Sequence, residues 1–136
     1  MRRKLLIGLL CGGLAACGLP PMVPLPPGDL QADRRACNAM YPERIGNYLA
    51  HADCVNAAVE RDAIPTARYP DLVRVQERLR SKYSAQIDSR VISPQTGARK
   101  MQEVDELVAA ATRERDTGRA APADRRLDRL QAMLER

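Results

Sequence analysis

Residues 70–111 read PDLVRVQERLRSKYSAQIDSRVISPQTGARKMQEVDELVAAA, and this stretch carries the clearest structural pattern in the chain. In its first half, apolar side chains recur every three or four residues, which is the spacing of one face of an α-helix. They are Leu72, Val75, Leu79, Tyr83 and Ile87. Pro70 suits a first helical turn, where its missing N–H would have no intrahelical acceptor. The spacing therefore predicts a helix that begins at Pro70.

The second half predicts another helix that packs against the first. Ser93 and Pro94 are typical of an N-cap followed by a first-turn proline, and Thr117-Gly118 is typical of a helix end. The apolar positions between them are Met101, Val104, Leu107, Val108 and Ala111. Two amphipathic helices with a short connection favour an antiparallel hairpin over residues 70–116. Its apolar surface, with the run 109–111 of alanines, is expected to provide a contact face for a partner.

Three further helices are expected outside this hairpin. Residues 31–41 and 43–62 are separated by Pro42, and the second of these segments has an apolar face. That face consists of Ile45, Leu49, Ala52 and Val55. A last helix, 122–135, begins at Pro122 and places Leu127, Leu130 and Leu134 on one side. No segment alternates with period two, so the sequence predicts an all-α domain over residues 32–136, a small helical bundle or hairpin.

The charged side chains are expected to cover the solvent side of these helices. Residues assigned to outward positions are Arg74, Glu77, Arg78, Arg80, Lys82, Arg125, Arg126 and Arg129. Every carboxylate falls where a solvated helix face would place it. The chain has no Phe and no Trp and only four Tyr, so its core must consist of Leu, Val, Ile, Met and Ala. Such a core stabilises weakly, and a covalent crosslink would help it.

The N-terminus has the pattern of an exported protein. Residues 2–4 are basic, and the uncharged segment that follows is too short to span a bilayer as a helix. It ends in Leu14-Ala15-Ala16-Cys17. This ending resembles the lipobox of bacterial lipoproteins, in which the cysteine is acylated and becomes the new N-terminus. The resemblance implies a signal peptide over 1–16 and a lipid anchor at Cys17. An ordinary secretory signal, or an uncleaved short helix, is the alternative.

Residues 17–31 are predicted to form an extended tether. Half of the ten prolines lie here, and proline excludes both a helix interior and an inner strand. A Pro-rich docking motif is the alternative interpretation. Gly18 takes the place of the aspartate that acts as an inner-membrane retention signal in lipoproteins of enteric-type bacteria. The resemblance therefore favours the periplasmic side of the cell envelope, and the outer membrane over the inner one.

Two cysteines remain after the expected processing, Cys37 and Cys54. The compartment outside the inner membrane is oxidising, so the two thiols are expected to form a disulfide between the first two helices. A redox or zinc site is the alternative. Their separation differs from a Cys-x-x-Cys motif, and His51, Asp53 and Cys54 do not all share one helix face. His51, the single histidine, is expected to be a surface residue.

The composition excludes several functions. Three of the 22 basic residues lie in the signal segment, so the rest is nearly balanced against 17 acidic residues and no nucleic-acid partner is expected. The chain lacks a Gly-rich phosphate loop and the common hydrolase motifs, so neither catalytic residues nor a cofactor is expected. We expect a structural or protein-interaction module with an envelope partner or weak self-association. A small-ligand binding module, or an inhibitor of an envelope enzyme, is the alternative, but it needs a pocket that a thin hairpin rarely encloses.

Overall fold

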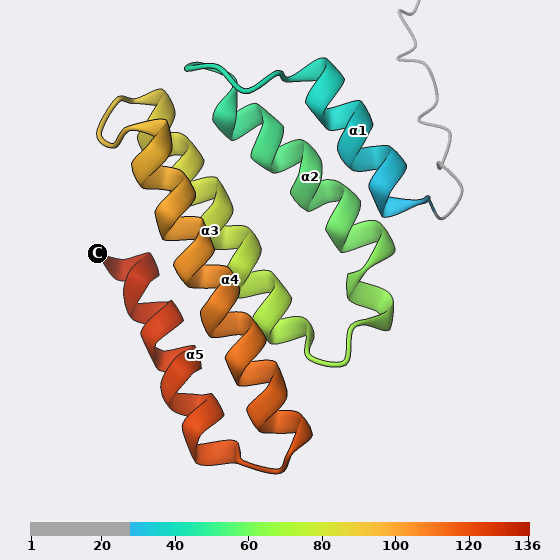
Figure 1. Ribbon diagram of the computed structural model, residues 1–136. Coiled ribbons are helices and arrows are strands. Elements are labelled where there is room, and N and C mark those ends of the chain that lie inside the picture. The colour runs from blue at the N-terminus through green and yellow to red at the C-terminus, as the bar shows by residue number, and fades with distance from the viewer. Residues whose placement is uncertain (1–27) are drawn as a thin grey trace, which may run out of the picture.

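The computed structural model describes residues 28–136, and this part of the chain is built from helices with no strand (Figure 1). The elements are α1 (Leu30–Met40), α2 (Tyr48–Asp62), a short 3₁₀ helix η1 (Ile64–Thr66), α3 (Pro70–Asp88), α4 (Pro94–Asp116) and α5 (Ala120–Glu135). The prediction of an all-α fold is confirmed. The signal segment 1–16, Cys17 and most of the expected tether lie outside the described residues.

The α3–α4 hairpin is present as predicted. Ser93 is the N-cap of α4, and its side chain accepts a hydrogen bond from the Thr96 backbone N–H. The apolar stripe of α3 is buried along its whole length, with Val75 and Leu79 inaccessible to solvent. On α4, Val104, Leu107 and Ala111 are buried. Within the alanine run, Ala111 is fully buried in the hairpin, whereas Ala109 is exposed, so the contact face for a partner stays a prediction.

The last helix is part of the core. Leu130 and Met133 of α5 are buried in the cluster formed by α3 and α4. α5 begins at Ala120, earlier than the expected start at Pro122, because proline is tolerated anywhere in a first turn. Lys82, expected to point outward, donates to the backbone carbonyls of Met133 and Leu134 at 2.9 and 2.8 Å. It thereby satisfies acceptors at the end of α5.

The start of α2 differs from the prediction. The helix begins at Tyr48 instead of residue 43, and Ile45 is about half exposed in the preceding turn. Gly46 has a φ of +97°, which interrupts the helical path. Asp88, at the end of α3, caps α2: its carboxylate accepts from the backbone N–H groups of Gly46, Tyr48 and Leu49 at 2.6, 3.2 and 2.9 Å. A cap from a distant residue leaves no local sequence pattern.

Removal of this cap should weaken the domain. Asp88→Ala leaves three N–H groups at the start of α2 without their acceptor, so we expect a loss of about 1.5 kcal/mol in the free energy of unfolding. Urea denaturation followed by circular dichroism measures it. The matched control is Asp128→Ala at an exposed position of α5. Equal losses in the two variants would contradict the capping role.

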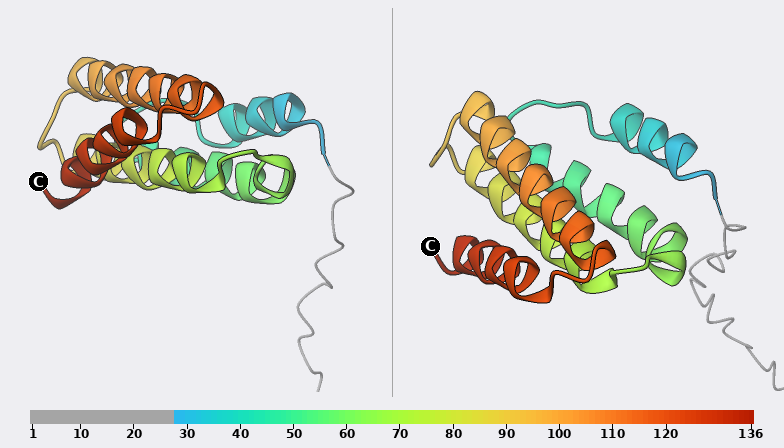
Figure 2. Two further views of the ribbon diagram at one scale, coloured as in Figure 1. Left: turned by 90° about the horizontal axis from the view of Figure 1, so that it is seen from below. Right: turned by 60° about the horizontal axis from the view of Figure 1, so that its bottom comes forward.

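The helices form two layers. α2 and α3 lie side by side, and α1 and α4 lie over them on the same side (Figures 1 and 2). α1 packs against α2 and against no other helix of the described part, whereas α4 packs against α3 and α5. A second small apolar cluster, Cys37, Val55 and Val59, holds α1 on α2. Because α1 and α4 do not contact each other, the side of the bundle between them is open.

Candidate functional site

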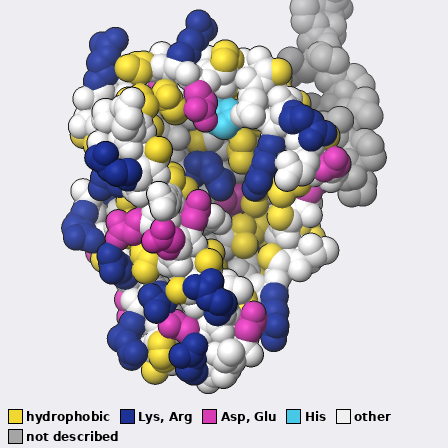
Figure 3. All heavy atoms as spheres, viewed as in Figure 1, with side chains coloured by type: hydrophobic (Ala, Val, Ile, Leu, Met, Phe, Trp, Pro, Cys, Tyr) yellow, Lys and Arg dark blue, Asp and Glu magenta, His cyan; other side chains and the backbone are white. Residues whose placement is uncertain are grey.

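A groove of about 740 Å³ occupies this open side, and we call it the α1–α4 groove. Its α1 wall carries Arg34 and Asn38, and its α4 wall carries Ala98, Met101 and Asp105. The floor is formed by Val55, Arg80, Tyr83 and Ile87 of α2 and α3. Figure 3 shows this face hollowed between α4 and α1, with hydrophobic side chains in the hollow and Lys or Arg side chains beside it. The small-ligand alternative needs a pocket, which a hairpin alone rarely encloses, and here the groove forms between the hairpin and the two N-terminal helices.

The wall formed by α1 is fixed by covalent and polar links to α2. Cys37 and Cys54 form a disulfide, with their Cα atoms 5.8 Å apart, so the predicted pairing is confirmed. Near the start of α1, the Gly28 N–H donates to the Asp62 carboxylate at 3.1 Å. The Arg61 guanidinium contacts both Asp62 and Asp33, which lowers the pKa of the Asp62 carboxyl despite its burial. These links orient α1 without closing it onto α4.

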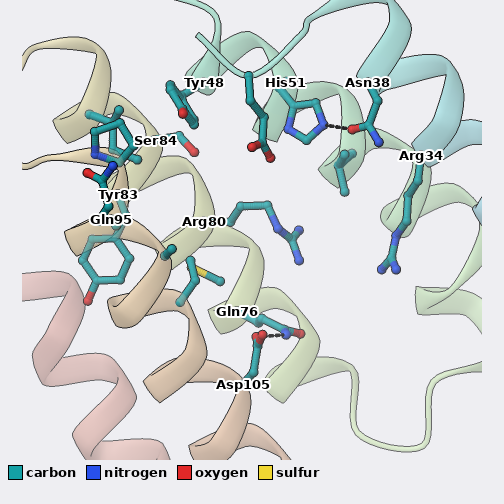
Figure 4. A pocket seen from close by; sticks show the side chains of 17 residues that line it. Arg34, Asn38, Tyr48, His51, Gln76, Arg80, Tyr83, Ser84, Gln95 and Asp105 are labelled. Carbon is teal, nitrogen blue, oxygen red and sulfur yellow. Dashed lines mark hydrogen bonds between the residues drawn. The ribbon is translucent and has the colours of Figure 1, made fainter. Parts of the chain in front are cut away.

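Two arginines from different elements face each other in the groove. Arg34 extends from α1 and Arg80 from α3, and Figure 4 shows the two guanidinium groups directed into the same space. Burial and then the Arg34 charge lower the pKa of Arg80. Its guanidinium donates to the neutral Oδ1 of Asn56. Neither Arg34 nor Arg80 forms an ion pair within residues 28–136.

Other polar side chains of the groove form hydrogen bonds with one another. A nitrogen of the His51 ring lies 2.6 Å from Asn38 Oδ1 (Figure 4). Gln76 donates to Asp105 at 2.7 Å. The candidate zinc residues do not come together, because Cys54 is in the disulfide and Asp53 accepts from the Ser81 hydroxyl at 3.0 Å. In the described range no three metal-ligating side chains converge on one point.

Comparisons with known proteins give no relative. No family model, curated protein or solved structure matches the chain. None of the helices in residues 28–136 is both long and apolar enough to cross a membrane. The groove is therefore interpreted from its own residues.

The groove residues were not predicted from the sequence, although the sequence of α3 contains one pattern that indicates them. Gln76, Arg80 and Ser84 recur every four residues and form a polar row beside the apolar stripe. In the structure all three line the groove, so Arg80 is not on the solvated face. No comparable pattern in the sequence of α1 indicates Arg34. Only the position of α1 brings it opposite Arg80.

The expectation that every carboxylate would be solvated was also wrong. Glu114 is 7% exposed and accepts hydrogen bonds from Nε and Nη2 of Arg126 at 2.8 and 2.9 Å, so Arg126 is not free on the surface. That hydrogen bonding lowers the pKa of the Glu114 carboxyl. Glu77 is 5% exposed, and its Oε1 has no hydrogen-bond partner in the described part of the chain. Burial, and then the charge of Glu60, raise the pKa of the Glu77 carboxyl.

Glu77→Gln should stabilise the protein at neutral pH. A raised pKa means that the folded state favours the protonated carboxyl, so the contribution of Glu77 to stability is greatest in acid and is lost as pH rises through its folded-state pKa. The neutral amide removes this penalty, and we expect a gain of about 1 kcal/mol at pH 7 that vanishes toward pH 4. Urea denaturation from pH 4 to 7 measures it. Exposed Glu135→Gln is the control, and a constant or negative difference would refute the assignment.

Proposed function

We propose that the chain is a lipid-anchored protein of the cell envelope and that its helical domain is a non-catalytic binding module with the α1–α4 groove as its site. The groove is the observation that supports binding. Its volume of about 740 Å³ lies in the range of small-molecule sites. Its lining is mixed, with polar and charged side chains such as Arg80 and Gln76 beside apolar ones such as Met101.

The chemistry of the groove favours binding over catalysis. The His51 imidazole is hydrogen-bonded to an amide, and not to a hydroxyl or carboxylate that would make it part of a nucleophile–base pair. The arginines stay charged at physiological pH, so they bind anions but do not exchange protons. These properties suit a receptor that holds a ligand unchanged.

A protein-interaction module is the second candidate, and one observation favours it. The large hydrophobic side chains that remain exposed among the described residues are Met40, Ile45, Leu49 and Val91. Met40 ends α1, Ile45 lies in the α1–α2 connection, Leu49 lies in the first turn of α2 and Val91 lies in the α3–α4 turn, and these segments are at the same end of the bundle (Figure 1). Clustered exposed apolar residues are typical of contact surfaces.

The anchor gives the first test. Cys17→Ser removes the thiol that would carry the lipid, and several acyl chains hold a protein to a membrane far better than one. We expect the wild-type protein in the membrane fraction. Its intact mass should correspond to a chain that begins at Cys17 and carries acyl groups. The serine variant should leave that fraction. A serine variant that is still processed and membrane-bound would contradict the anchor. Because Gly18 stands in place of the aspartate that signals inner-membrane retention, we expect the wild-type protein in the outer-membrane fraction.

The groove gives the second test. Ala98 is exposed and lines the groove, so Ala98→Trp should fill it, whereas Ala57→Trp places the same indole at an exposed position of α2 outside it. The mature full chain in a nonionic detergent is mixed with dialysable and non-dialysable fractions of envelope extract. A ligand raises the melting temperature of the form that binds it. We expect the dialysable fraction to stabilise the wild type and Ala57→Trp, but not Ala98→Trp.

The other outcomes are equally clear. Stabilisation by the non-dialysable fraction alone would favour the protein-interaction candidate. Equal stabilisation of all three proteins would place binding outside the groove. If neither fraction stabilises the wild type, the binding module is refuted.

A further inference from the structure

The two arginines of the groove form a pair of positive charges that no carboxylate of the described residues contacts directly. Arg34 and Arg80 come from α1 and α3, and their guanidinium groups point toward one another across the groove (Figure 4). Like charges at such a site repel, more strongly in partly buried surroundings than in water. The fold nevertheless holds the groups there. A bound anion would convert this repulsion into two attractions.

Arg80 is held in position for such a role. Its guanidinium donates to Asn56 Oδ1, and the Nδ2 of Asn56 donates to the Glu77 carbonyl at 3.1 Å and the Ser81 hydroxyl at 2.9 Å. Asn56 is neutral, so it fixes the guanidinium without cancelling its charge. A guanidinium has five N–H donors, and this contact leaves others available to the groove.

Arg34 and Arg80 differ from the seven described arginines that contact carboxylates, and they share the lack of an ion pair with others such as Arg78. Such partners exist for Arg35, Arg61, Arg68, Arg74, Arg115, Arg126 and Arg129. The groove has two acidic side chains of its own, Glu43 and Asp105. Asp105 accepts from Gln76, and neither carboxylate lies within ion-pair distance of Arg34 or Arg80. The two guanidinium groups therefore have no carboxylate in direct contact, and Asp105 offsets the Arg80 charge only from a longer distance.

The apolar part of the groove limits the kind of anion. The exposed Ala98 and the partly exposed Met101 on the α4 wall offer hydrocarbon surface, whereas Val55 and Ile87 in the floor are almost fully buried. A free inorganic anion would leave this surface wet, whereas an organic anion would cover it. The volume of the groove suits a small molecule.

We propose that the α1–α4 groove binds a small organic anion whose carboxylate or phosphate group lies between Arg34 and Arg80 and whose apolar part lies against Ala98 and Met101 of α4. The inference rests on the proposed binding function and adds the ligand class. Arginine pairs carboxylates and phosphates through charge-assisted, often bidentate hydrogen bonds. Because Arg34 lies on α1 and Arg80 on α3, one anion would also bridge the two sides of the open bundle.

Labelling of arginines tests this proposal on the mature full chain in a nonionic detergent. Phenylglyoxal modifies accessible guanidinium groups, and mass spectrometry follows each site. The probes are octanoate, octyl phosphate, inorganic phosphate and uncharged octyl glucoside. We expect octanoate or octyl phosphate to slow the labelling of Arg34 and Arg80, and inorganic phosphate to do so only at higher concentration. Which of the two amphiphiles acts at lower concentration identifies carboxylate or phosphate as the preferred head group.

Neighbouring arginines provide internal controls. Arg35 follows Arg34 on α1, and Arg78 is exposed on α3, and neither lines the α1–α4 groove. Their labelling should not change. Arg34→Gln and Arg80→Gln should each weaken binding of the better probe roughly tenfold, since each removes a charged hydrogen bond. Arg35→Gln and Arg78→Gln should bind as the wild type does. Arg34 is exposed, so its variant should keep the wild-type helicity and melting temperature.

Four results would overturn the proposal: no protection by any anion, equal protection of Arg35 and Arg78, equal protection by octyl glucoside, or unchanged binding by the folded Arg34→Gln protein. These results are distinguishable from failure of the proposed function. If the dialysable extract stabilises the wild type but not Ala98→Trp, while no anion protects the arginines, the groove binds a ligand of another class. If no fraction stabilises the wild type, the binding function itself fails.

Discussion

Loss of the Cys37–Cys54 disulfide is expected to release α1 and remove one wall of the groove. Within residues 28–136, α1 packs on no helix other than α2, and Cys37 is its single buried residue. A helix of 11 residues is marginal in water without tertiary support. The chain-entropy model predicts that Cys37→Ala/Cys54→Ala costs about 3 kcal/mol for a loop of this size. We expect a lower melting temperature and loss of hydrogen-exchange protection in α1.

The effect should be confined to one side of the molecule. The core cluster of α3, α4 and α5 includes no residue of α1, so amides in those helices should keep most of their protection. Reductant added to the wild type should reproduce the change, whereas the double variant should not respond to it. Persistent protection of α1 in the double variant would show that noncovalent contacts suffice to hold it. Because Arg34 lies on α1, protection of Arg80 by an anion should weaken at the same time.

Leu130→Ala is expected to destabilise the whole domain. Leu130 is inaccessible to solvent and packs in one cluster with Leu79, Val104 and Leu107. Truncation of a fully buried leucine leaves a cavity, and this costs about 3 kcal/mol. The loss is a large part of the stability of a small domain and should lower the melting temperature by roughly 15 °C. A core without Phe or Trp has little other apolar area to compensate.

Thermal denaturation with hydrogen exchange separates a global effect from a local one. If α5 is integral to the core, amides of α3 and α4 should lose protection together with those of α5. Leu49→Ala, at a position that is 36% exposed, is the matched control and should cost much less. A small effect of Leu130→Ala, restricted to α5, would instead identify a helix that frays independently.

Local patterns in the sequence were sufficient for most of the helices. The stripes on 70–88 and 94–116 lie on single helix faces, and the Ser93 cap acts within a few residues of its own position. The Cys37–Cys54 pair could be predicted because few partners were possible. The start of α2 could not, because its cap, Asp88, is some forty residues away along the chain. Burial of Glu77 and Glu114 depends likewise on neighbours that the periodicity of one helix does not reveal.

The candidate site was almost entirely a product of tertiary structure. The sequence by itself determined the helical class, the apolar faces, the disulfide pair and the pattern that predicts an anchor at Cys17. Only the packing decided that α1 lies on α2 away from α4, which leaves the groove open and brings Arg34 opposite Arg80. The physical reason is that helix propensity, caps and periodicity act only over a few neighbouring residues. A groove depends instead on which faces of separate helices remain uncovered after the core has packed.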